Sequence, residues 1–144
     1  MLDLDGVTPI PENAWAPVRK IRKIILEFIS FDEESNYIFT NELFEAENDW
    51  RVYRQVKETA DKRGSLFIPV KLAVSPDERA RRITNPERLA RFKTTNLAEI
   101  QLKKELIKID NPHLLELDVT NLRPVQASTE ILNYVESVKS DKKS

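Results

Sequence analysis

The chain has 144 residues, 40% of them apolar, so it is long enough for one domain with a hydrophobic core and short for two. Its 23 basic and 24 acidic residues leave a net charge of -1, which gives no general attraction for nucleic acid or an anionic membrane. Without cysteine it can form neither disulfides nor thiolate metal sites, and we expect no metal at its single histidine, His113.

No stretch of the chain approaches the roughly 20 consecutive apolar residues of a membrane-spanning helix, and the N-terminus does not resemble a secretion signal. We therefore expect a single cytoplasmic domain over residues 1–144 that binds neither nucleic acid nor membranes. Gly6 and Gly64 are the two glycines, which excludes a glycine-rich phosphate-binding loop within this chain.

The N-terminal half predicts two amphipathic helices separated by a strand. Apolar residues recur at helical spacing over residues 11–30 and again over 47–63. Gly64 is placed to end the second helix in a left-handed conformation. Between the helices, residues 37–40 are aromatic or β-branched and predict a buried strand.

The C-terminal half alternates strands with helices. Ser75, Pro76 and Glu78 together predict the start of a helix, with Ser75 as its N-cap and Pro76 at its first position. Asn85 begins a similar pattern, so we expect two short helices with a turn at Thr84. The other predicted elements are strands over 66–74 and 113–120 and helices over 96–108 and 124–138. Strands that alternate with helices predict a mostly parallel sheet in a three-layer α/β/α domain.

Five segments, in this order, resemble P-loop kinase-like proteins of the AAA family ATPase, chloramphenicol phosphotransferase and shikimate kinase type. They are DGVTPIPENAW, YIFTN, KRGSLFIPVKL, ERARRITNPERLARFKTTN and LELDVTNLRPVQAS, and together they cover nearly the whole chain. The resemblance implies a P-loop NTPase-like fold, ATP and Mg²⁺ as cofactors of the intact family, and an arginine-bearing lid over residues 76–95.

The resemblance also assigns roles to single residues. The lid cations, which would bind the phosphates of a nucleotide, are Arg82, Arg88 and Arg91, because guanidinium groups suit phosphate oxygens. Asp118 and Arg123 are candidate contacts to the nucleotide base or substrate. Asn41 is a further candidate on its position alone, because it follows a predicted strand at the edge where open α/β sheets bind ligands. The competing interpretation is a solvated pair of helices in which Asp77 pairs with Arg81 and Glu78 with Arg82.

The chain departs from this family at its most important motif. The G-x-x-x-x-G-K-[ST] loop and the central first strand would precede Leu4, so the phosphate nest, its lysine and the magnesium-binding hydroxyl have no counterpart here. We expect a remnant or fragment of an ATP-dependent small-molecule kinase that cannot transfer phosphate by itself, with no catalytic residue assignable.

Two alternatives remain open at this stage. The first is a non-enzymatic interaction or oligomerisation module, because strands that lack their central neighbour have unpaired edges and predict self-association. The second is a piece of a longer, active kinase. Whether the chain is an enzyme stays open, and its substrate cannot be read from these residues.

Overall fold

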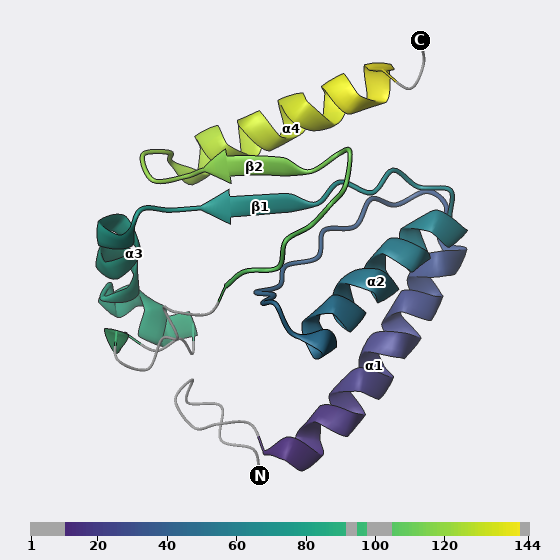
Figure 1. Cartoon of the computed structure of the whole chain (residues 1–144), viewed down its shortest axis with the longest axis horizontal. Coiled ribbons are helices and arrows are strands. Elements are labelled where there is room, and N and C mark those ends of the chain that lie inside the picture. Colours follow the sequence, from purple (N-terminus) through teal and green to yellow (C-terminus); the bar gives the residue numbers. More distant parts are fainter. Residues whose placement is uncertain (1–10, 92–94, 98–104, 142–144) are drawn as a thin grey trace. The chain divides into compact units, whose positions relative to one another are not determined.

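The computed structural model of this protein describes residues 11–91, 95–97 and 105–141 (Figure 1). The chain divides into two compact units, and we treat each by itself. The first comprises Met1–Phe67 and Gln101–Lys108, and the second comprises Ile68–Ile100 and Ile109–Ser144.

The described residues combine helices with a two-stranded parallel sheet, which places the chain in the mixed α/β class. The three-layer P-loop arrangement and the single domain stay predictions. None of the helices within the described ranges has both the length and the apolar composition needed to cross a membrane.

Helix α1 (Glu12–Phe31) confirms the amphipathic helix predicted over residues 11–30. Its buried side chains are Leu26 and Ile29, and the helix contacts α2. Pro17 lies inside the helix, where its missing N–H removes one backbone hydrogen bond. The helix ends at Asp32, whose carboxylate accepts hydrogen bonds from two backbone N–H groups of the following turn.

Helix α2 (Glu47–Lys62) confirms the second predicted helix. Glu47 and Asp49 lie in its first turn, where negative charge is favourable. Gly64 adopts a φ of 63°, as predicted, and its N–H donates to the carbonyl of Asp61 at 3.0 Å. In the first unit both helices run in the same direction, because the connecting segment returns along α2 (Figure 1).

Residues 37–40 do not form the buried strand that the sequence predicts, since none of them is in a strand. Ile38 is 92% exposed, and Phe39 is 41% exposed. Tyr37 is held instead by side chains: its hydroxyl donates to Asp32, and the guanidinium of Arg63 lies 5.1 Å from its ring centre. A β-rich run without a neighbouring strand to pair with has no ladder to join, so local propensity alone does not make a strand here.

The helix predicted over residues 96–108 is wrong in its last part, while residues 98–104 lie outside the described residues. Leu106 forms an antiparallel bridge with Phe44, and the N–H of Ile107 donates to the carbonyl of Leu43 at 3.1 Å. Ile107 is buried in this pairing. Pairing with a distant segment therefore overrides the helical periodicity of this stretch.

The second unit is built around strands β1 (Val70–Ala73) and β2 (Leu115–Asp118), which pair in parallel with Val70 opposite Leu115. Both lie within predicted strands, but each is trimmed to four residues. Strand β1 starts directly after Pro69, which cannot donate to a ladder. Helix α4 (Pro124–Asp141), which contains the predicted last helix, runs along β2 (Figure 1).

Between the strands, the two predicted short helices are confirmed as α3 (Pro76–Ile83) and the 3-10 helix η1 (Pro86–Arg91). Ser75 is the N-cap of α3, and its hydroxyl accepts a hydrogen bond from the Glu78 N–H at 3.3 Å. The carboxamide of Asn85 accepts from the Glu87 N–H at 3.0 Å, which caps η1 in the same way. The turn falls at Thr84, as predicted.

Candidate functional site at the carboxyl edge of the strand pair

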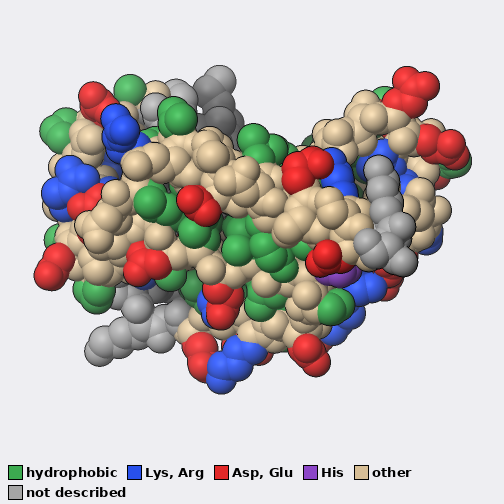
Figure 2. Space-filling model, turned by 90° about the horizontal axis from the view of Figure 1, so that it is seen from above, with side chains coloured by type: hydrophobic (Ala, Val, Ile, Leu, Met, Phe, Trp, Pro, Cys, Tyr) green, Lys and Arg blue, Asp and Glu red, His purple; other side chains and the backbone are tan. Residues whose placement is uncertain are grey.

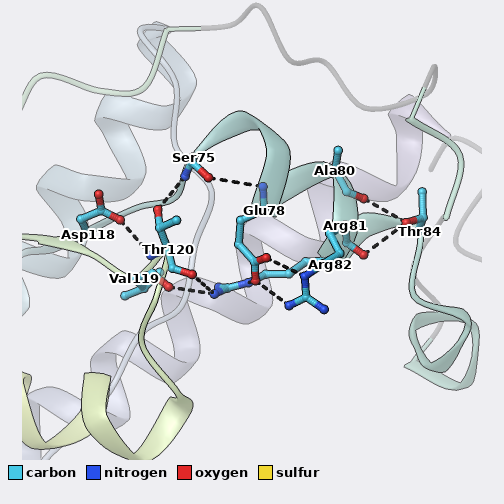
Figure 3. Close-up of polar contacts among 9 residues, drawn as sticks. All are labelled: Ser75, Glu78, Ala80, Arg81, Arg82, Thr84, Asp118, Val119 and Thr120. Carbon is cyan, nitrogen blue, oxygen red and sulfur yellow. Dashed lines mark hydrogen bonds and ion pairs between the residues drawn. The ribbon is translucent and has the colours of Figure 1, made fainter.

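The ends of β1 and β2 meet at one edge of the sheet, which is where open α/β sheets place their ligands. Ala73 and Asp118 are the last residues of the two strands and lie opposite each other. The Ser75 N–H donates to the Thr120 hydroxyl oxygen at 2.8 Å, so the two chain segments stay joined beyond the strands (Figure 3). Helix α3 begins at this same edge.

Arg82 connects α3 to the segment that follows β2 (Figure 3). Its Nη2 donates to the carbonyl oxygen of Val119 at 2.7 Å and, more weakly, to that of Thr120 at 3.4 Å. Its Nε donates to Glu78 at 2.7 Å. The guanidinium is therefore engaged on several sides by groups of the chain itself, as in a structural arginine.

The carboxylate of Glu78 is the negatively charged group to which both Arg81 and Arg82 bond. Arg81 reaches its carboxylate through two hydrogen bonds of 2.6 and 2.7 Å, and Arg82 adds a third. These two guanidinium groups, Arg81 first, hold the pKa of the Glu78 carboxyl at about 2. The predicted pair of Glu78 with Arg82 is confirmed.

Asp118 is exposed and takes part in the turn after β2. Its Oδ1 accepts a hydrogen bond from the Thr120 N–H at 2.8 Å. Hydrogen bonding from the Thr120 side chain and backbone lowers the pKa of this carboxyl below its usual value. A carboxylate held by the backbone two residues ahead is typical of a turn residue.

The structure brings Arg82 and Asp118 to the same edge of the strand pair, where both bond to the residues that follow β2. Arg123 is exposed at the start of α4, where its N–H donates to the side-chain oxygen of Gln126 at 2.9 Å. Asn41 is exposed and belongs to the first unit. Arg88 is half-buried in η1, and the side chain of Arg91 lies outside the described part. Their roles toward phosphate or substrate stay predictions.

Thr120 is the member of the cluster that sequence reasoning missed. It receives the Ser75 N–H and holds Asp118, so it is the point where the two strand ends meet. The one signal in the sequence is its position two residues after Asp118, where the backbone N–H of a turn commonly donates to the aspartate side chain.

The cluster offers no set of metal ligands, since no three His, Asp or Glu side chains gather suitably anywhere in the described ranges. Figure 2 shows one face of the molecule, where acidic and basic side chains are intermingled and hydrophobic side chains reach the surface between them.

Comparison with models of known protein families, with curated proteins and with solved structures found no match.

Ionisation of Glu78 gives a testable pH dependence. Because its pKa in the folded protein is lowered from 4.5 to about 2, its contribution to stability is complete above pH 4.5 and is lost as the pH falls toward 2. We expect Glu78→Gln to unfold more easily than the parent in urea at pH 7 and to match it near pH 2. Glu87→Gln, an exposed control, should not differ from the parent at pH 7 in this way, so its difference from the parent should not disappear near pH 2. A constant difference at all pH values would contradict this role of Glu78.

Proposed function

We propose that this chain is a protein-interaction module whose docking surface is one side of α1. The observation that supports this is a group of large hydrophobic side chains on that helix with exposed fractions from 48% to 78%. We call this group the α1 apolar face, and it consists of Ile21, Ile24, Ile25, Phe28 and Phe31.

Most of the α1 apolar face projects away from the side of the helix that is already buried, and Ile25 lies at the border between the two sides. Leu26 and Ile29 are 6% and 5% exposed, and at 100° per residue they project to a different side of the helix from Ile24 and Phe28. The basic residue Lys23 projects to a third side. Helix α1 therefore has apolar side chains on two sides. A helix at the surface of a protein ordinarily has one apolar side, which packs against the core.

The size of this surface also favours a binding role. With ordinary side-chain areas, the five residues expose on the order of 600 Å² per chain, at the upper end of the largest patch on a typical monomer. Scattered exposed hydrophobic residues need no explanation, but a contiguous group along one helix does. It is a typical feature of helices that bind another protein.

A second candidate function is binding of a nucleotide or phosphate by a kinase-like remnant. Its support is the parallel strand pair, with α3 and its arginines starting at the carboxyl edge. It carries less weight because Arg82, one of the three proposed lid cations, is engaged by Glu78 and by two backbone carbonyls.

The stability of two variants separates a docking surface from a core. Because Ile24 is 66% exposed, Ile24→Glu should change the free energy of unfolding by less than about 0.5 kcal/mol. Leu26→Ala, on the buried side, should lower it by about 2–5 kcal/mol. Urea unfolding at a concentration where sedimentation shows monomer measures both. If Ile24→Glu costs as much as Leu26→Ala, this face is part of the protein's own core and the proposal is wrong.

Titration with Mg-ATP separates the two candidate functions. The interaction module predicts no saturable heat in isothermal titration of the 144-residue chain. The kinase-like remnant predicts salt-sensitive binding that Arg88→Ala weakens and that Arg51→Ala, an exposed arginine of α2, leaves unchanged. Saturable binding with this pattern would favour the second candidate.

A further inference from the structure

The exposed side of α1 has the residue spacing of a coiled-coil seam. Apolar residues recur in alternating steps of three and four along the helix, which is the spacing that lets side chains interlock with those of a second helix. The seam consists of Ala14, Pro17, Ile21, Ile24, Phe28 and Phe31. Leu26, which is buried, projects to the opposite side.

We propose that two copies of this chain pair through this seam, with their α1 helices antiparallel. The inference rests on the proposed function, since it names the partner of the same surface. A two-fold axis between the helices makes the contact self-complementary and closes the assembly at two copies.

The sizes of the seam residues favour the antiparallel direction. When Ile21 of one copy lies against Ile24 of the other, Phe28 meets Pro17 and Phe31 meets Ala14. Each large ring then faces a small residue, which is how closely packed layers fill space. In a parallel pair, each seam residue would instead face the same residue of the other copy. The two copies of Phe28 and of Phe31 would then crowd each other, and the two copies of Ala14 would leave a gap.

The charges beside the seam favour the same direction. Lys20 and Glu27 are both exposed and flank one side of the seam, seven residues apart. In the antiparallel pair, Lys20 of each copy lies beside Glu27 of the other, and symmetry forms this pair twice. In a parallel pair, Glu27 would instead lie beside Asp32 of the other copy, and like charges repel.

The other flank of the seam is apolar. Val18 and Ile25 lie there, 37% and 48% exposed, and in the antiparallel pair Ile25 of one copy meets Val18 of the other. Two copies together would cover on the order of 1,200 Å², the lower end for specific interfaces. The expected dimer is therefore reversible and depends on concentration.

Exchanging the two charges tests both the partner and the direction. Sedimentation equilibrium would be run on the full chain, on Lys20→Glu and on Glu27→Lys. Each variant dimer contains two like-charge pairs, so its dissociation constant should rise about tenfold. An equimolar mixture of the two variants should recover the affinity of the parent, because the mixed dimer contains two opposite-charge pairs. Lys23→Glu, on the polar side, should have little effect.

Three outcomes would overturn the inference, and they differ from failure of the proposed function. Tighter association of Glu27→Lys would indicate the parallel direction, since the new lysine would face Asp32. A parent dimer that ignores both exchanges and also Ile24→Glu would use another surface. A parent that stays monomeric at all concentrations would exclude a second copy as partner. The proposed function fails on a different result, which is an Ile24→Glu variant as unstable as Leu26→Ala.

Discussion

Helix α1 carries large apolar side chains on two sides, and only one of them is buried. Leu26 and Ile29 lie in the interior of the first unit, while the phenylalanines of the C-terminal half of the helix, at 68% and 78% exposure, face outward. Removing apolar area from water is the main favourable term in both folding and association. A helix of this kind therefore connects the fold of the unit to the binding role that we propose for its exposed side.

The second unit depends on polar contacts between distant segments. Its two strands have four residues each, which is a short ladder, and side-chain contacts within it and at its carboxyl edge support the pairing. Lys71 and Glu116 form an ion pair across the strands at 2.8 Å. At the carboxyl edge, Arg82 and Ser75 bond to the residues after β2. Because these groups satisfy one another, we interpret this edge as a structural connection between α3 and the sheet.

The elements with local signals could be predicted from the sequence. The Ser75 cap, the left-handed Gly64 and the pairing of Glu78 with Arg82 all depend on residues within one or two helical turns. The strand predicted over residues 37–40 was wrong, and so was the last part of the helix predicted over residues 96–108, because both outcomes depend on whether a distant segment pairs with them. The contact of Arg82 with Val119 joins residues 37 positions apart and had no signal in the sequence.

The same limit applies to the surface of α1. Periodicity predicted an amphipathic helix over residues 11–30, and this was confirmed, but a repeat of apolar residues does not tell which of them a neighbouring helix covers. The exposed fractions of Ile24 and Leu26, 66% and 6%, separate the two sides. Self-association was predicted from unpaired strand edges, whereas the exposed side of α1 gives a different physical basis for the same expectation.

Thiol labelling at one position of the seam would show most directly what covers this surface. The chain has no cysteine, so Ile24→Cys gives a unique reactive group, and Lys23→Cys gives a matched control on the polar side. If a second copy covers the seam, the labelling rate at position 24 falls as protein concentration rises, while the rate at position 23 stays constant. A rate at position 24 that does not change with concentration would contradict pairing through α1.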